Sequence, residues 1–370
     1  MADPALTEGT LYVNRDRDFR TGEFGPYVKI GIVRGERDAS ARNMEHQTGN
    51  PREVITVHEL FSPMVEHLET QLHHRFASYW VHGEWFEMDE YFVEKEVLPE
   101  AKRIVEQQKE SFEDFEAKTI QKAVVSSGLV RKASDEEKEV AEKCFAAREA
   151  LIQAKSLKDF IDSQIRIMIG TDNGIEGIVN LSYKKGPTSF DKKKFLEENE
   201  ELAKQYFEDR EDKLSGSIIL AKGKSLNELN DIADEKLKEI KKEIPKFSWK
   251  SKGKKAKSRD DSSLILHAAY VSSMKAIAEA DWECERQKAR LVKLLGDDKG
   301  IEGIITYNRT AKTQDPAFNA SKFKEENPEL YASYLKEGKE SVAVNIHPYR
   351  AYSPADIDFT KYSKTIYDQI

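Results

Sequence analysis

Short apolar runs between polar loops dominate the first hundred residues of the chain. Residues 9–13 (GTLYV) and 27–33 (YVKIGIV) are rich in β-branched and aromatic side chains and predict two strands. Gly25-Pro26 lies between them, in a loop rich in Asp, Arg and Gly, and favours a hairpin with a long connection. Residues 54–60 (VITVHEL) predict a third strand.

Helical spacing follows the second and third of these strands. Residues 38–47 predict a helix, which Gly49-Asn50-Pro51 ends. Ser62-Pro63 predicts the start of another helix, with the serine as its cap and the proline in its first turn. Trp85 and Phe86 predict a last short strand, and a helix from Tyr91 leads out of the region. The second helix presents a core-facing stripe at three- and four-residue spacing, formed by Val65, Leu68, Leu72 and Phe76.

The rest of the chain carries an internal duplication. The motif GIEGI at 174–178 recurs at 300–304, and FLEEN at 195–199 matches FKEEN at 323–327. Each copy predicts a long helix, a tight turn, a strand pair and a short helix. The long helices, around 136–168 and 264–294, pair either with one another or with a second chain.

These patterns predict an α+β protein. A small mixed sheet flanked by helices is followed by a helix-rich tandem repeat. The predicted units are a compact domain at 1–106, a linker at 107–134, repeat 1 at 135–220, a charged linker at 221–262 and repeat 2 at 263–370.

Composition narrows the class of protein. Charged residues make up 34% of the 370 residues and the net charge is -8, which argues mildly against strong non-specific DNA binding without a metal. No stretch approaches the ~18 apolar residues that cross a membrane. The N-terminus lacks the basic and apolar regions of a signal peptide. Cys144 and Cys284 match no zinc spacing, so we expect a cytoplasmic protein with reduced thiols.

One basic tract, residues 250–259, interrupts this acidic background. Two interpretations stay open. The tract is either a flexible, solvated linker or an arm that contacts nucleic-acid phosphates. The candidate contact residues are Lys252, Lys254, Lys255, Lys257 and Arg259.

The first region holds a set of side chains suited to phosphodiester hydrolysis, which needs a positioned nucleophile, charge neutralisation and usually a metal on oxygen ligands. Tyr12 and Lys29 come from strands whose pairing would bring them side by side. Arg42 and His46 are four residues apart and share a helix face. Glu69 lies on the core-packed helix, where its carboxylate can point to the domain edge. Singly, each of these residues is as easily explained as a solvated or half-buried side chain.

The order of these residues strengthens the set. GTLYV followed by YVKIG resembles the signature strands of the GIY-YIG nuclease superfamily, in the branch whose second motif reads Lys-Ile-Gly. The resemblance continues through Arg42, residues 47–51 (QTGNP), Leu68-Glu69 and residues 83–86 (GEWF), and so covers about residues 9–88. The first motif departs from the family pattern, because Thr-Leu-Tyr replaces Gly-Ile-Tyr.

The resemblance implies a role for each residue of the set. Tyr12 would act at the attacking water, and Lys29 would assist it from the place of the family's second tyrosine. Arg42 would stabilise the phosphate and His46 would assist proton transfer. Glu69 would hold one Mg²⁺ or Mn²⁺. His73 and His74 point apart on a helix, so a packed His73 is favoured over a zinc pair.

The repeats are less informative. Each copy is faintly similar to the C-terminal segment of phage YqaJ-type recombinases, most clearly at residues 327–331 (NPELY). The leading hypothesis is a metal-dependent endonuclease acting on DNA, with RNA not excluded. Its repeats would serve targeting or assembly, in phage, mobile-element or antiphage biology. The alternative is a non-catalytic nucleic-acid-binding or oligomeric assembly protein.

Overall fold

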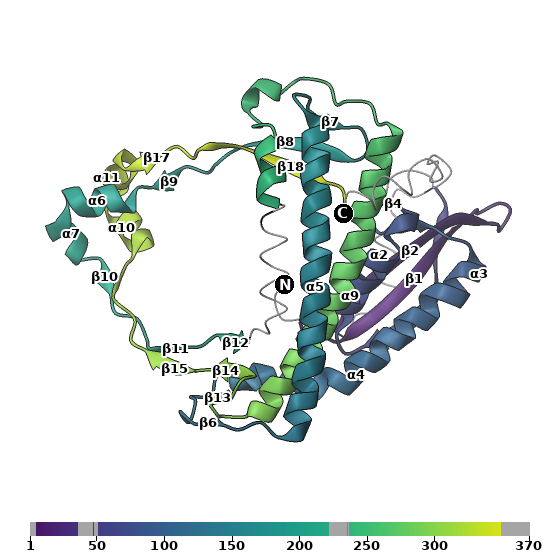
Figure 1. Ribbon diagram of the computed structural model, residues 1–370. Coiled ribbons are helices and arrows are strands. Elements are labelled where there is room, and N and C mark those ends of the chain that lie inside the picture. The colour runs from purple at the N-terminus through teal and green to yellow at the C-terminus, as the bar shows by residue number, and fades with distance from the viewer. Residues whose placement is uncertain (1–4, 36–46, 48–50, 222–234, 236, 349–370) are drawn as a thin grey trace.

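A computed structural model describes residues 5–35, 47, 51–221, 235 and 237–348. The architecture is α+β, as the hydrophobic pattern predicts, with small sheets flanked by helices. Three parts are distinct in Figure 1: an N-terminal sheet with its helices, a pair of long helices, and a loop of strands and short helices on the far side of that pair.

The N-terminal sheet has five strands in the order β3-β1-β2-β5-β4, with antiparallel neighbours. The hairpin connection expected from residue 14 to 26 is much shorter, because β1 and β2 extend into it. Arg17 remains in the ladder and pairs with Glu53 at 2.6 Å, while the Arg15 guanidinium lies 4.4 Å from the centre of the Phe24 ring. The strands are β1 (Gly9–Arg17), β2 (Phe24–Arg34), β3 (Glu53–Ser62), β4 (Trp80–His82) and β5 (Trp85–Glu87).

Helix α2 (Val65–Arg75) covers one face of this sheet. Ser62, expected to cap the helix, instead ends β3, and Met64 is the N-cap residue. The Ser62 hydroxyl accepts a bond from the Met64 N–H and donates to Gln108 at 2.7 Å, so it joins the strand to α4 (Leu98–Gln121). The predicted core stripe is confirmed, because all of its members are buried: Val65, Leu68, Leu72 and Phe76.

The two long helices of the repeats pack against each other within the chain. They are α5 (Asp135–Ile169) and α9 (Asp261–Leu295), which confirms the predicted long helices. They run in opposite directions (Figure 1), so Glu136 near the start of α5 pairs with Arg290 near the end of α9 at 2.9 Å.

Strands are exchanged between the two repeat copies. At one end of the helix pair, β8 (Val179–Lys185) of copy one pairs with β18 (Glu340–Ile346) of copy two. At the other end, β12 (Ile218–Leu220) of copy one pairs with β14 (Ile305–Tyr307) of copy two. The two ribbons continue outward and meet, so the chain closes into a ring (Figure 1). The outer pairs are β9 (Ser189–Phe190) with β17 (Leu335–Lys336), β10 (Phe207–Glu208) with β16 (Ala317–Phe318), and β11 (Lys213–Ser215) with β15 (Thr310–Lys312).

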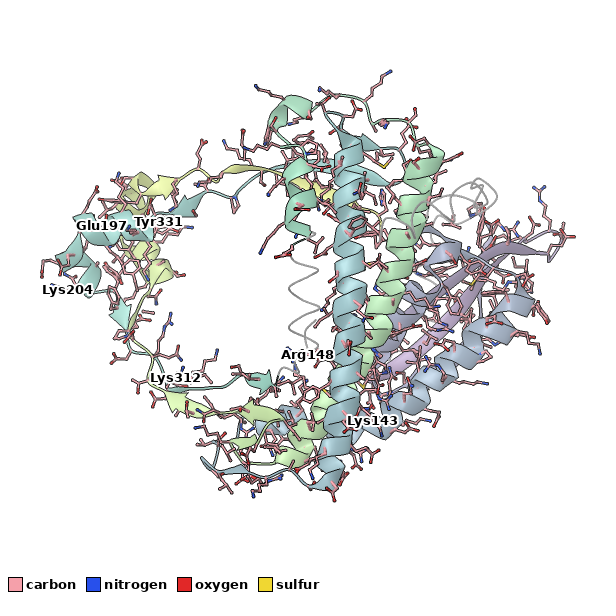
Figure 2. The ribbon with its side chains drawn as sticks, viewed as in Figure 1. Lys143, Arg148, Glu197, Lys204, Lys312 and Tyr331 are labelled. Carbon is pink, nitrogen blue, oxygen red and sulfur yellow. The ribbon has the colours of Figure 1, made fainter. Side chains whose placement is uncertain are left out.

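The ring closes at a tip built equally from both copies, where Figure 2 labels Glu197, Lys204 and Tyr331. Asn199 donates to the Tyr334 hydroxyl at 2.7 Å, and Asn327 donates to the Tyr206 hydroxyl at the same distance. The helices of the tip are α6 (Lys192–Glu198), α7 (Glu200–Lys204), α10 (Ala320–Glu326) and α11 (Pro328–Ser333). The buried side chains of the tip form one cluster, made of Phe195, Ala203, Tyr206, Phe318 and Phe323.

The basic tract at 250–259 is not the flexible linker that its composition suggests. Its backbone adds to the turn after α5, because the Lys257 N–H donates to Gly174 O at 2.9 Å and Lys257 O accepts from Glu176 N at 3.0 Å. Arg131, before α5, holds the matching place beside Gly300 and Ile301 in the second copy. The tract is therefore part of the repeat, and its five candidate contact residues are exposed: Lys252, Lys254, Lys255, Lys257 and Arg259.

The sheet domain is docked on α9. Gln71 of α2 donates to Ala278 O at 3.1 Å, and the Trp282 ring lies 3.8 Å from the His67 ring and stacks on Phe115 at 5.5 Å. Helix α4 runs through residue 106, where the sequence predicted a domain boundary. Over the residues that the structure describes, no helix is apolar and long enough to span a bilayer.

Candidate active site

Tyr12 and Gly31 are direct partners across β1 and β2. Leu11 and Val13 point into the hydrophobic core, so Tyr12 between them points to the opposite face of the sheet. A Cβ on Gly31 would lie 2.5 Å from the Tyr12 hydroxyl, which means that the phenol rests on the Gly31 backbone. The Tyr12 side chain is buried there, with 1% exposed.

Lys29 is on the same face, two residues before Gly31. It is 6% exposed, and its ammonium forms an ion pair with Glu84 in the turn between β4 and β5. The backbone fixes this turn, because Ile30 N donates to Glu84 O at 3.1 Å. The buried Lys29 side chain therefore has a carboxylate held directly beside its ammonium group.

Glu69 lies on α2, between two contacts that fix the helix along β2. One turn before it, Glu66 pairs with Arg34 at the end of the strand. One turn after it, the His73 Nε2 lies 2.8 Å from Ile30 O. The Glu69 carboxyl is thereby placed along the edge of β2, on the side of the Lys29–Glu84 pair.

The Glu69 carboxyl is electrostatically unusual. Its pKa is raised to about 7, first by burial and then by the nearby charge of Glu84, against smaller lowering effects of Lys29 and Arg34. None of the described residues forms a hydrogen bond or an ion pair with this carboxyl. It is a half-buried acid beside a second carboxylate, and titratable groups of this kind are typical of functional sites.

His73 has a packing role. Its ring is buried, lies 5.2 Å from the Phe86 ring and donates through Nε2 to Ile30 O. Burial lowers its pKa, with a smaller raising effect of the bond to Ile30. The prediction of a packed His73 is confirmed, and this histidine holds Glu69 in place through α2.

Arg42 and His46 lie outside the described residues, so their places relative to this cluster stay predictions. The predicted helix that carries them ends at Gln47, which is described. The Gln47 side chain donates to Arg52 O at 3.0 Å and accepts from Val54 N at 2.9 Å, and so ties the end of that segment to the start of β3.

Glu84 is the residue that sequence reasoning passed over. It stood within the motif GEWF at 83–86 but received no role. Its function as the partner of Lys29 depends on the pairing of β2 with β5, which places Lys29 opposite Trp85. The pairing of such short strands around a tight turn leaves no strong signal in the sequence. The only available sign was an acidic residue directly after the turn glycine, Gly83.

The donor set fits a hard divalent ion. Mg²⁺ is usually bound through one or two carboxylates with water completing its shell. Glu69 and Glu84 supply such oxygens, and the pKa of Glu69 is raised first by burial and then by the charge of Glu84. Within the described part of the chain, no group of three or more His, Cys, Asp or Glu forms a metal cage. A Mg²⁺ or Mn²⁺ ion here would be held chiefly by Glu69.

Comparison with known proteins gives a match in the first part of the chain. Residues 9–122 match the T5orf172 domain, a phage-associated domain of nuclease type. The match includes Tyr12, Lys29, Glu69 and Glu84, and it ends at the last turn of α4. No curated protein and no solved structure matches the chain. A domain of this type is compatible with a nuclease-like or DNA-related role.

Proposed function

We propose that residues 9–122 form a metal-dependent endonuclease of the GIY-YIG type, a hydrolase that cuts phosphodiester bonds in DNA. One observation carries the proposal: the carboxyl of Glu69, which forms no hydrogen bond or ion pair with the described residues and has a pKa near 7, lies beside the buried Lys29–Glu84 pair on the edge of β2. The match of this segment to the T5orf172 domain supports it independently.

Each residue has a chemical task in this proposal. Glu69 binds Mg²⁺ or Mn²⁺, which supplies positive charge at the phosphate when bound. Lys29 places an ammonium next to the developing negative charge, and Glu84 keeps that ammonium oriented. Tyr12 orients or activates the attacking water. From the family resemblance, Arg42 binds a phosphate oxygen and His46 assists proton transfer.

The repeats position the cutting domain in this proposal. They contact it through α9, and the exposed cations of residues 250–259 are candidates for contacting DNA phosphates. The phage-associated first domain supports a role in phage, mobile-element or antiphage biology, in line with the faint resemblance of the repeats to phage YqaJ-type recombinases.

A cleavage screen tests the proposal. The full-length protein is incubated with supercoiled plasmid, branched DNA and RNA, in Mg²⁺, in Mn²⁺ and in EDTA. We expect metal-dependent nicking or linearisation of DNA that Lys29→Met reduces strongly. Absence of cleavage on every substrate and in every metal would contradict the proposal.

The burial of Tyr12 favours one alternative. A phenol that is 1% exposed has little access to solvent water. In the alternative, the same domain docks nucleic acid or a protein without cutting it. The screen separates the two functions, because a docking domain binds the DNA in EDTA and leaves it intact in metal.

A further inference from the structure

The basic tract at residues 250–259 contains no acidic residue, and all of its cations are exposed: Lys250, Lys252, Lys254, Lys255, Lys257 and Arg259. Within the described part of the chain, no carboxylate forms an ion pair with any of these cations. Two acids follow directly, Asp260 and Asp261, so six cations face two acids and residues 250–261 carry a net charge of +4. The chain as a whole has a net charge of -8, which makes this local excess of positive charge a distinct feature.

Neutral groups hold two of these cations in place. The Lys252 ammonium lies 4.4 Å from the centre of the Trp249 ring, and the Lys254 ammonium donates to Thr171 O at 2.9 Å. An aromatic face and a backbone carbonyl orient a lysine side chain but carry no formal negative charge to cancel its own. The tract therefore keeps ordered positive charge at the surface.

The backbone of the tract arranges three further cations along one direction. Lys255 and Lys257 both bond through their backbone groups to the turn after α5, so the segment between them is extended. Alternate side chains of an extended segment project to the same side, about 6.6 Å apart. Arg259 continues this row, because its guanidinium lies beside the same turn, 3.6 Å from where a Cβ on Gly177 would stand.

The second repeat copy provides an internal comparison for this row. Arg131 there occupies the place of Lys257, since each lies three residues before the cap of its long helix and bonds to the matching turn. Arg131, however, forms ion pairs with Glu137 at 2.6 Å and with Asp298 at 2.7 Å. The central cation is therefore neutralised in copy two and lacks an ion pair among the described residues in copy one.

The positions beside the central cation differ in the same sense. Copy one has Lys255 and Arg259 where copy two has Leu129 and Ala133. Copy two builds the same turn without these charges, so the fold of the repeat does not require them. Like charges at close spacing repel one another, and a row of them that the fold does not need indicates an anionic ligand.

The composition of the tract favours a nucleic-acid backbone over an acidic protein. A protein interface has an apolar core inside a polar rim, whereas residues 250–259 contain no apolar side chain larger than alanine. Lysine and arginine neutralise the phosphates of a nucleic acid without reading its sequence. The match of residues 9–122 to a domain of nuclease type favours DNA among the polyanions.

We propose that residues 250–259 are a sequence-independent site for the DNA backbone that only copy one of the repeat carries. A duplex would then be held at one end of the helix pair. Figure 1 shows that end at β7 (Gly174–Ile175), with the neutralised counterpart at the other end, at β13 (Gly300–Ile301). The choice of DNA rests on the proposed function, whereas binding at this site needs neither metal nor cleavage.

Duplex binding by the full-length protein in EDTA tests the site. The fluorescence anisotropy of a labelled duplex is measured against protein at several salt concentrations. The site variant combines Lys255→Gln, Lys257→Gln and Arg259→Gln, which change exposed side chains and leave the backbone bonds of the turn in place. A charge-keeping variant combines Lys255→Arg, Lys257→Arg and Arg259→Lys.

The matched control removes the same charge from exposed cations elsewhere, which form no ion pair with the described residues: Lys102→Gln, Lys132→Gln and Lys322→Gln. We expect the site variant alone to bind about tenfold or more weakly at low salt. Its salt slope should fall by about two to three, because each phosphate contact contributes about 0.9. Equal affinity and slope in the site variant and the control, or no binding by the wild type, would overturn the proposal.

Failure of this site and failure of the proposed function are distinguishable. A wild type that cuts no DNA but loses duplex binding in the site variant would support the site and contradict the nuclease. Competition with a poly-glutamate peptide tests the choice of ligand, and we expect unlabelled duplex to displace the labelled duplex at a far lower concentration of charge. Equal displacement by the peptide would overturn the assignment to DNA in favour of an acidic protein.

Discussion

The phenol of Tyr12 occupies the space that any side chain at Gly31 would fill. The two residues face each other across β1 and β2, and a Cβ on Gly31 would stand 2.5 Å from the Tyr12 hydroxyl and 2.6 Å from its ring carbon. The glycine of the second signature strand is thus explained by the tyrosine of the first. Their contact fixes where the candidate nucleophile-orienting group lies.

Gly31→Ala should therefore displace Tyr12. We expect a loss of about 1–3 kcal/mol in the free energy of unfolding, because neither the strand backbone nor the buried ring can yield easily. Chemical denaturation of Gly31→Ala in the wild-type and Tyr12→Ala backgrounds measures the coupling. The cost should nearly vanish when Tyr12 is alanine. An equal cost in both backgrounds would show that the glycine serves another purpose.

The Lys29–Glu84 pair should be coupled in stability. Glu84→Gln leaves the ammonium of Lys29, which is 6% exposed, without its carboxylate. We expect this variant to lose about 1–3 kcal/mol of unfolding free energy. Lys29→Met added to Glu84→Gln should recover part of that loss, because no buried charge then remains unpaired. A double variant whose loss equals the sum of the single losses would exclude the coupling.

The stability of the protein should depend on Glu69 between pH 4.5 and 7. Burial and Glu84 raise the pKa of Glu69 from 4.5 to about 7, so the folded state holds a proton that the unfolded state releases. Stability from this group is present below pH 4.5 and is lost as the pH rises through 7, by on the order of 3 kcal/mol. Glu69→Gln should abolish this dependence, as measured by urea unfolding across the range.

The matched control for this experiment is Glu106→Gln, which changes an exposed acid of α4 in an ion pair with Lys109. Its pH profile should follow that of the wild type. Mn²⁺ at pH 7.5 should stabilise the wild type and this control but not Glu69→Gln. Identical pH profiles in all three proteins would remove the electrostatic basis of the site.

The tip of the ring should open without unfolding the helix pair. Phe323 is fully buried between the copies, and Phe323→Ala should destabilise the tip by about 3–5 kcal/mol. Hydrogen exchange should accelerate at 189–208 and 317–336 while α5 and α9 stay protected. Phe61→Ala, at a site that is 55% exposed, is the control. Uniform acceleration along the chain would show that the ring and the helix pair unfold together.

Local patterns predicted the elements better than their partners. The stripe of Val65, Leu68 and Leu72 follows helical spacing and lies in the core. Apolar residues recur every three or four positions because one face of the helix is buried, so this pattern can be recognised locally. Ser62 followed by Pro63 read as a helix start, yet the hydroxyl is used by Gln108, a long-range contact that a local rule does not include.

The exchange of strands between the two repeat copies could not be predicted from the sequence, for a physical reason. Val179 to Lys185 carries the signal of a strand, but its partner, Glu340 to Ile346, is far along the chain and equally short. Cys144 and Cys284 likewise form a hydrogen bond across α5 and α9, which raises the pKa of Cys144. Their separation in the sequence gave no sign of this contact. Glu69 was predicted as a site residue, whereas its neighbour Glu84 depended on strand pairing.

Cleavage by Glu69→Gln is the most direct test of the nuclease assignment. Supercoiled plasmid is incubated with Mn²⁺ and equal amounts of the wild type, Glu69→Gln and Glu106→Gln, after calorimetry has shown that all three are folded. We predict nicking by the wild type and Glu106→Gln, and a rate at least about a hundredfold lower for Glu69→Gln, since its amide is a poor ligand for the metal. Cleavage by Glu69→Gln at the wild-type rate would contradict the assignment of the active site.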